Sequence, residues 1–174
     1  LPSLDITINN AGVMREGYFE TLSASDFEAV LNANFLGCVH VTHIVLPYLK
    51  KSRGRLINIA SAGGLTGSFG YTPYCSSKYA LVGLTECLRY ELKPQGITVQ
   101  MVCPAEFDSP LVDELETYRT PENRALTLMI PKLPLEKIVK ETLKGIEKNR
   151  FKIIPGWRTR LMVWSIQHFP GISR

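Results

Sequence analysis

Residues 55–78, RLINIASAGGLTGSFGYTPYCSSK, decide the fold of this chain. The segment opens with a short apolar run, residues 55–60, that is typical of a buried strand. A loop rich in glycine and serine follows, and Thr72-Pro73 then marks the start of a helix, because proline is tolerated in the first helical turn. Strand, loop and helix in this order are the beginning of a unit in which helices join parallel strands.

The same alternation continues on both sides of this segment. Apolar runs and helical spacing predict further strands at 4–8, 97–103 and 151–154, and helices at 24–51, 73–93 and 135–146. Ser23 and Asp26 form a capping-box pattern at the start of the first helix. Residues 113–134 are polar and punctuated by proline, and we expect a mobile excursion with some helix there. The prediction is a single α/β domain, residues 1–174, with a Rossmann-like, doubly wound parallel sheet.

The composition of the chain excludes several classes of protein. The 174 residues are 45% hydrophobic and 21% charged, an ordinary balance for one globular domain. The net charge of +4 is scattered and does not favour nucleic acid as a partner. No apolar stretch approaches the ~18 uninterrupted residues of a membrane span, so we expect no transmembrane segment, and no secretory signal is visible. The cysteines include no C-x-x-C pair, which predicts reduced thiols in a cytoplasmic compartment. The histidines have no further metal-ligating residues at suitable spacing, so we expect no metal site.

Tyr74 and Lys78 are the first candidates for chemistry. Four residues apart on the predicted helix, they lie on one face, and an ammonium beside a phenol lowers the pKa of that phenol. Such a pair serves as a general acid or base toward an alcohol or ketone, and Ser61, at a strand end, can donate to the same oxygen. Taken alone, a Tyr-x-x-x-Lys pattern also describes an ordinary solvated helix face.

Five motifs in order and spacing show that the chain resembles the short-chain dehydrogenase/reductase family over nearly its whole length. They are Asn9-Asn10-Ala11-Gly12, Asn34-Phe35-Leu36-Gly37, Ile59-Ala60-Ser61, Tyr74-Cys75-Ser76-Ser77-Lys78, and residues 104–110. This resemblance implies an NAD(P)-dependent oxidoreductase that reduces a carbonyl or oxidises a secondary alcohol by hydride transfer.

The resemblance also implies roles for single catalytic residues. Tyr74 matches the catalytic acid/base, and Lys78 matches the residue that lowers its pKa and holds the nicotinamide ribose. Ser61 matches the serine that orients the substrate carbonyl. Asn34 matches the asparagine that supports a proton-relay water from an irregular helical turn.

Cofactor-binding residues are implied in the same way. Asn10, Ala11 and Gly12 match the turn that lines the adenosine side of the cofactor. The loop over the nicotinamide matches Pro104, Ala105, Phe107 and Ser109. The family usually has glycine and threonine where this chain has Ala105 and Ser109, so this loop departs from the family pattern at two positions while serine keeps the hydroxyl.

Substrate and partners follow only from finer similarities. Leu92-Lys93-Pro94, residues 67–71 and Asp108-Ser109-Pro110 are similar to segments of the 3-ketodihydrosphingosine reductases. This similarity favours a small-molecule ketone or alcohol, with a long-chain or lipid 3-keto compound as one candidate, and NADP over NAD. Family members usually associate through their two long helices, so we expect a homodimer or homotetramer.

The carboxyl-terminal segment, residues 157–174, has three alternative interpretations. Trp157, Leu161 and Trp164 fall on one helical face with arginines nearby, which suits peripheral contact with a membrane surface. An apolar lid and a subunit contact fit the same pattern equally well.

The resemblance further implies that the amino-terminal strands and the Gly-rich, pyrophosphate-binding turn of the family are missing from this sequence. The first predicted strand corresponds to the family's fourth, so we expect the carboxyl-terminal two-thirds of the Rossmann domain, with one sheet edge open. The alternative to an enzyme is a non-catalytic truncated fragment or an interaction module that retains the active-site half.

Overall fold

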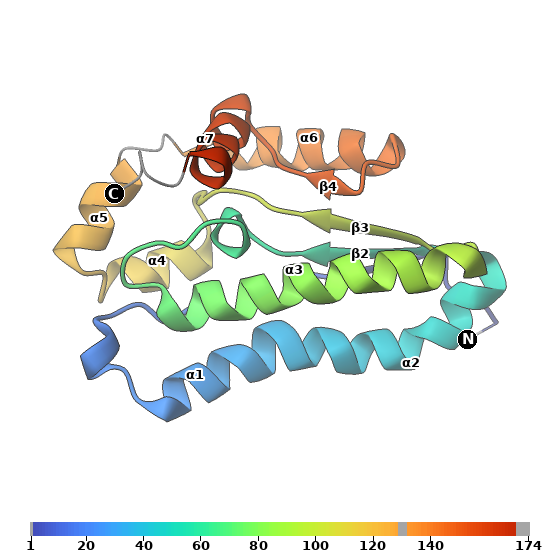
Figure 1. Cartoon of the computed structure of the whole chain (residues 1–174), viewed down its shortest axis with the longest axis horizontal. Helices are drawn as coiled ribbons and strands as arrows, with labels where there is room; N and C mark the ends of the chain where they lie inside the picture. The colour runs from blue at the N-terminus through green and yellow to red at the C-terminus, as the bar shows by residue number, and fades with distance from the viewer. Residues whose placement is uncertain (1, 129–131, 170–174) are drawn as a thin grey trace.

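The computed structural model describes residues 2–128 and 132–169. Its core is a four-stranded parallel sheet in the order β1-β2-β3-β4 (Figure 1). The strands are β1 (Ile6–Asn9), β2 (Arg55–Ile59), β3 (Thr98–Val102) and β4 (Lys152–Ile153). The predicted α/β class and parallel sheet are confirmed, while β4 is shorter than expected because only two of its residues pair with β3.

Helices connect the strands and cover both faces of the sheet (Figure 1). They are α1 (Ala24–Leu31), α2 (Gly37–Ser52), α3 (Thr72–Leu92), α4 (Pro110–Glu116), α5 (Pro121–Leu128), α6 (Leu135–Glu147) and α7 (Trp157–His168). The capping box expected at Ser23 and Asp26 is present at the start of α1. Residues 113–134 contain the end of α4 and the whole of α5, and residues 129–131 of that stretch lie outside the described part.

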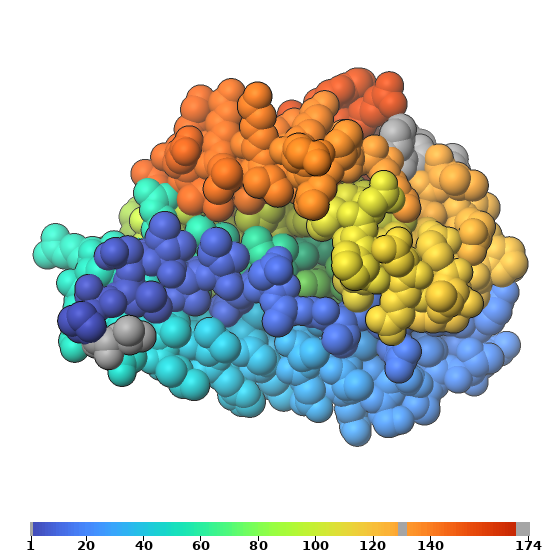
Figure 2. Space-filling model, turned by 180° about the vertical axis from the view of Figure 1, so that it is seen from behind, coloured from blue at the N-terminus to red at the C-terminus, as the bar shows by residue number. Residues whose placement is uncertain are grey.

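Alternation along the strands explains the two layers. Leu56 and Val99 pack with Leu49 and Leu92 of α2 and α3. Ile57 and its neighbours point to the opposite face, toward α6, since successive side chains of a strand alternate. On that second face Ile6 and Ile8 of β1 remain about half exposed, at 50% and 53%. Figure 2 shows β1 and the loop after it at the surface, in blue.

The long amino-terminal helix is not regular. The sequence predicted one helix over 24–51, but a π-helical turn, Asn32–Leu36, separates α1 from α2. This turn directs the fully buried Asn34 side chain inward. A single inserted π turn of this kind commonly accompanies a functional site.

The same helix corrects one sequence-based exclusion. Residues Ala24–Ser52 form one helical stretch of 29 residues that is long and apolar enough, by length and composition, to cross a membrane. The rule of uninterrupted apolar residues was therefore too strict. A core helix of a globular domain passes the same test, and Thr42 and Leu49 of this helix are buried in the fold.

Candidate active site

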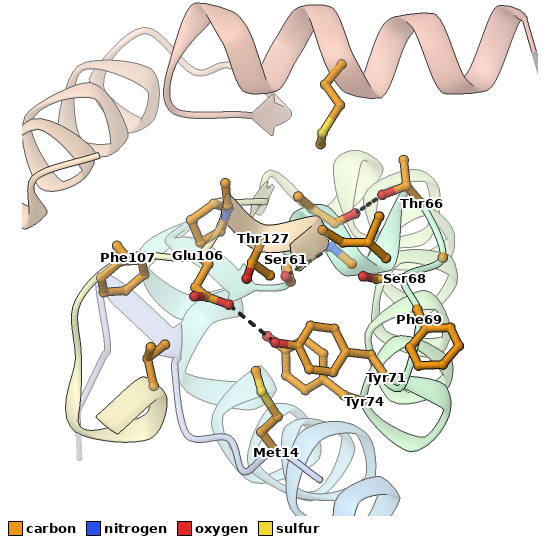
Figure 3. A pocket seen from close by; sticks show the side chains of 18 of the residues that line it. Met14, Ser61, Thr66, Ser68, Phe69, Tyr71, Tyr74, Glu106, Phe107 and Thr127 are labelled. Carbon is orange, nitrogen blue, oxygen red and sulfur yellow. Dashed lines mark hydrogen bonds between the residues drawn. The ribbon is translucent and has the colours of Figure 1, made fainter. Parts of the chain in front are cut away.

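A cavity of about 740 Å³ lies where the loops after β1, β2 and β3 meet α4, α5 and α7. Six of the predicted residues line it, namely Ser61, Tyr74, Pro104, Ala105, Phe107 and Ser109. Figure 3 shows the Ser61 and Tyr74 side chains pointing into the same space. Parallel sheets place their sites at the carboxyl ends of the strands, which is why residues so far apart in sequence meet here.

Tyr74 stands in the first turn of α3, partly buried, beside the loop that carries Ser61. Burial raises the pKa of Tyr74 to about 12, and a hydrogen bond with the Ser61 hydroxyl offsets part of this rise. The prediction from sequence was a lowered pKa for Tyr74, because it took only the neighbouring Lys78 ammonium into account. Desolvation of the phenolate is the larger effect here, so the phenol is protonated at neutral pH.

Lys78 lies one helical turn beyond Tyr74 and is 4% exposed. Its Nζ is 5.7 Å from the centroid of the Tyr74 ring and donates a hydrogen bond of 3.0 Å to the carbonyl oxygen of Ile59. Burial lowers the pKa of this ammonium to about 8. The Lys78 side chain is therefore held by the Ile59 carbonyl at the end of β2 rather than by the Tyr74 phenol, although Lys78 and Tyr74 lie on the same face of α3, as expected.

Asn34 joins the π turn to two other elements. Its Oδ1 accepts the backbone N–H of Val13 at 2.7 Å, and its Nδ2 donates to the Val13 carbonyl at 2.9 Å. Nδ2 also donates to Ser77 Oγ at 2.9 Å, and Ser77 in turn donates to the Tyr74 carbonyl at 2.7 Å. Asn34 thus fixes the loop after β1 against the helix that carries Tyr74.

The predicted cofactor residues divide into two groups. Pro104, Ala105, Phe107 and Ser109 line the cavity, as does Tyr74. Ser109 also caps α4, because its hydroxyl accepts the backbone N–H of Val112.

Asn10, Ala11 and Gly12 form the second group, on an exposed loop outside the cavity lining. A Cβ at Gly12 would lie 3.2 Å from Asn34 Oδ1 and 3.6 Å from Lys78 Nζ, so this glycine lets the loop approach both side chains. The loop after β1 therefore belongs to the same site as Lys78, on its outer side.

Sequence reasoning missed the wall opposite Tyr74. Glu106 lines the cavity and accepts a hydrogen bond from Tyr71 at 3.3 Å (Figure 3). It also accepts a hydrogen bond from Arg119 at 2.6 Å. The remaining apolar wall comes from Met14, Phe69, Leu111, Val112, Leu126, Met162 and Ile166. Glu106 could have been noticed, since it is an acid directly inside the predicted 104–110 loop, but nothing local marks Arg119 as its partner.

The family model described as short chain dehydrogenase matches residues 1–120. The chain belongs to the short-chain dehydrogenase family. Among curated relatives of this chain, the 3-ketodihydrosphingosine reductase of Mus musculus is 34% identical over 150 residues, covering 83% of this chain and 45% of the relative. The 3-oxoacyl-acyl-carrier-protein reductase FabG of Thermotoga maritima is 34% identical over 113 residues, and the match covers 64% of this chain and 46% of that protein.

Solved structures confirm the fold. A short-chain dehydrogenase/reductase from Burkholderia phymatum in complex with NAD superposes with a TM-score of 0.82 at 24% identity, covering 99% of this chain and 68% of that one. A short-chain dehydrogenase from Sphingobium yanoikuyae in complex with NADPH gives 0.77 at 24% identity, covering 98% and 65%. Both the family resemblance and the similarity to 3-ketodihydrosphingosine reductases are thus confirmed. The chain spans about half the length of the curated relatives it matches.

The remaining predictions about side chains concern metals and thiols. Within residues 2–128 and 132–169, no group of three or more His, Cys, Asp or Glu could hold a metal ion. All four cysteines are free, with Cys38, Cys75 and Cys103 buried and Cys87 exposed. Burial raises the pKa of Cys75 and of Cys103, which fits packing rather than nucleophilic chemistry.

Proposed function

We propose that this chain carries the catalytic half of an NAD(P)-dependent oxidoreductase that reduces a carbonyl or oxidises a secondary alcohol. The supporting observation is the convergence of Ser61 and Tyr74 on one cavity, with the Lys78 ammonium 5.7 Å from the Tyr74 ring. A phenol and a hydroxyl that face one space are the groups needed to donate to, and exchange a proton with, a single substrate oxygen.

The residues present fit a nicotinamide dinucleotide. Lys78 uses one of its three N–H groups on Ile59, and the nearby Gly12 has no side chain to block its Nζ, which suits an ammonium that binds sugar hydroxyls. Residues 10–12 and Lys78 would hold the nucleoside portions, and Pro104, Ala105, Phe107 and Ser109 would line the nicotinamide. The cofactor, when bound, supplies or accepts the hydride.

The chain's own residues then handle the proton. In the reducing direction Tyr74, protonated because burial raises its pKa to about 12, gives its proton to the substrate oxygen. Ser61 donates a hydrogen bond to the same oxygen and stabilises the negative charge that develops there. Lys78, placed on the same helix face, stabilises the phenolate that remains. Asn34 holds the helix and the loop after β1 in register, and we assign it the support of a water between Lys78 and solvent.

The substrate class is inferred from the cavity wall. Much of the wall consists of apolar side chains from α4, α5 and α7, which suits a long-chain or lipid 3-keto compound. Two relatives, a 3-ketodihydrosphingosine reductase and a 3-oxoacyl-acyl-carrier-protein reductase, are named for 3-keto substrates. The similarity to the first favours NADP over NAD.

Partners and location are part of the same proposal. We assign the exposed apolar residues of α2 and α3, Val41, Ile44, Tyr79 and Tyr90, to contacts between subunits of a homodimer or homotetramer. On α7, Trp157, Leu161 and Trp164 are 59%, 53% and 48% exposed, which supports peripheral membrane contact from a cytoplasmic location, or a lid or subunit contact. Residues 170–174 of that segment lie outside the described part.

The test of the enzymatic proposal is Tyr74→Phe in the natural full-length protein. Turnover of a long-chain ketone should fall at least about 100-fold, because the proton donor is lost while the ring remains. Cofactor binding, followed by nicotinamide fluorescence, should be retained. Tyr48→Phe, at a tyrosine of α2 outside the cavity lining, is the matched control and should leave turnover unchanged.

Two results would contradict the proposal, and the second of them would favour the alternative, a non-catalytic fragment or interaction module. Turnover by Tyr74→Phe at the wild-type level contradicts the role of Tyr74. Failure of the full-length protein to bind either NAD or NADP contradicts the enzymatic proposal as a whole.

A further inference from the structure

The junction between α4 and α5 is bonded to the loops after three successive strands. Toward the loop after β1, Tyr118 donates to the carbonyl of Met14 at 3.3 Å, and Tyr18 donates to Glu122 at 2.9 Å. These two contacts lie on the outer side of the junction. Three further contacts of the same junction, called inner contacts here, are made by the buried residues Glu16, Arg119 and Asn123. Residues 118–123 are therefore held from several sides rather than resting on the surface.

The first inner contact is a buried carboxylate. Glu16, in the loop after β1, is 5% exposed and accepts both the hydroxyl of Thr120 at 2.5 Å and its backbone N–H at 3.0 Å. Gly70 makes room for it, because a Cβ there would overlap Glu16 Oε1, and its φ of +76° also requires glycine. A carboxylate this buried is stable only while both donors remain in place.

The second inner contact is an ion pair in the cavity wall. Arg119 Nη2 lies 2.6 Å from Glu106 Oε2 in the loop after β3, and it donates to the Tyr71 hydroxyl at 3.1 Å. Its Nη1 donates to Thr127 of α5 at 2.7 Å and pairs with Glu116 of α4 at 3.2 Å. One guanidinium thus connects α4, α5 and the floor of the cavity.

The third inner contact reaches the loop after β2. The fully buried Asn123 donates from Nδ2 to the carbonyl of Phe69 at 2.7 Å. Its backbone N–H donates to Thr120 Oγ1 at 3.4 Å, so the same hydroxyl that binds Glu16 also caps the start of α5. Thr120 therefore links two of the three inner contacts.

We propose that this junction is a positioning element that sets how closely α4 and α5 approach Tyr74, and that Glu16 and Thr120 are its positioning residues. Both helices contribute to the cavity wall, through Leu111 and Val112 on α4 and through Leu126 and Thr127 on α5. None of the junction residues 118–123 lines the cavity itself. Loosening the junction moves the wall away from the substrate without touching Ser61, Tyr74 or Lys78, so it weakens substrate binding more than it slows the proton transfer.

The test compares Thr120→Val, which keeps the shape and removes the hydroxyl, with Thr120→Ser, which keeps the hydroxyl. Hydrogen exchange of the amides in 121–128, measured by mass spectrometry on the natural full-length protein, should become at least about 10-fold faster in Thr120→Val, because the hydroxyl's hydrogen bonds with Glu16 and with the Asn123 N–H are both lost. Exchange in β2 and β3 should not change, and Thr120→Ser should behave as wild type. Glu16→Gln, nearly the same size but with a single acceptor oxygen, should also speed exchange in 121–128.

Kinetics supply a second measurement, which rests on the proposed function. For a long-chain ketone the KM of Thr120→Val should rise about 10-fold, while kcat and the KM for the cofactor stay within about two-fold. If no ketone is turned over by the wild type, the proposed function fails, and the exchange comparison still decides the role of the junction. Wild-type exchange in both Thr120→Val and Glu16→Gln overturns the proposal. Equal acceleration in the core strands, a loss confined to kcat, or no rescue by Thr120→Ser overturns it as well.

Discussion

Replacing Lys78 by methionine should make the fold more stable at neutral pH. The ammonium is 4% exposed, and its hydrogen bond to the Ile59 carbonyl does not compensate for its removal from water. Burial is the main cause that lowers its pKa from 10.5 to about 8. Methionine fills nearly the same volume without a charge.

The size and sign of the effect follow from the two pKa values. In the unfolded chain Lys78 titrates near 10.5, and in the folded chain it titrates near 8, so between these pH values the unfolded chain binds the extra proton and rising pH favours folding. Below pH 8 the folded state carries the full cost, which is about 3 kcal/mol at about 1.36 kcal/mol per pH unit. Loss of the hydrogen bond to Ile59 returns about 1 kcal/mol of this, leaving a net gain of about 2 kcal/mol for Lys78→Met at pH 7.

The assay is urea denaturation of wild type and Lys78→Met at several pH values from 7 to 10.5, on the chain itself. The difference in the free energy of unfolding should be largest at pH 7 and should shrink as the pH rises from 8 to 10.5. Lys50→Met, at an exposed position of α2, is the control and should show a small difference that does not depend on pH. A Lys78→Met variant that is less stable than wild type at pH 7, or a difference that is constant across this range, would refute the reasoning.

Three further changes test the packing and the surface. Asn34→Ala should lower the free energy of unfolding by about 2–4 kcal/mol, because three buried hydrogen bonds are lost, whereas the exposed Asn32→Ala should change it by less than about 0.5 kcal/mol; thermal denaturation measures both. Gly64→Ala should cost about 1–3 kcal/mol, since its Cβ would lie 2.7 Å from the Lys78 carbonyl oxygen, whereas Gly67→Ala, with nothing within 4 Å, should be tolerated; equal stability of the two would contradict the close approach. Sedimentation with anionic phospholipid vesicles should capture the wild type several-fold better than Trp164→Ser, and equal partitioning would argue against membrane contact by α7.

Much of the architecture was predictable because it depends on local patterns. Apolar runs located all four strands to within about two residues, and the capping box located the start of the first helix. The irregular turn at Asn32–Leu36 was not predicted by periodicity, because Asn34, the buried residue of this turn, is bonded to Val13 and Ser77, which lie far from it in sequence. The resemblance to the family, rather than the spacing, implied an irregular turn there.

The candidate site was predictable in part for the same reason. The cavity brings together Ser61, the loop 104–109 and Tyr74. Ser61 and the loop follow strand ends that could be read from the sequence, and Tyr74 lies in the first turn of the helix that Thr72-Pro73 marks. The direction of the Tyr74 pKa was not predictable, because it depends on how much water the surrounding loops exclude. The role of Arg119 was not predicted, because Arg119 and its partner Glu106 lie in different segments of the chain and no short sequence motif connects them.

By itself, the sequence determined the order of strands and helices and placed Tyr74 and Lys78 on one helix face, because both follow from backbone geometry within a few residues. Only the tertiary structure decided which groups are deprived of water, and so the pKa values of these two side chains. It alone also brought Glu16 to Thr120 across 104 positions of sequence. Contacts at that separation depend on how the loops after all the strands pack together, and no local pattern of residues specifies that packing.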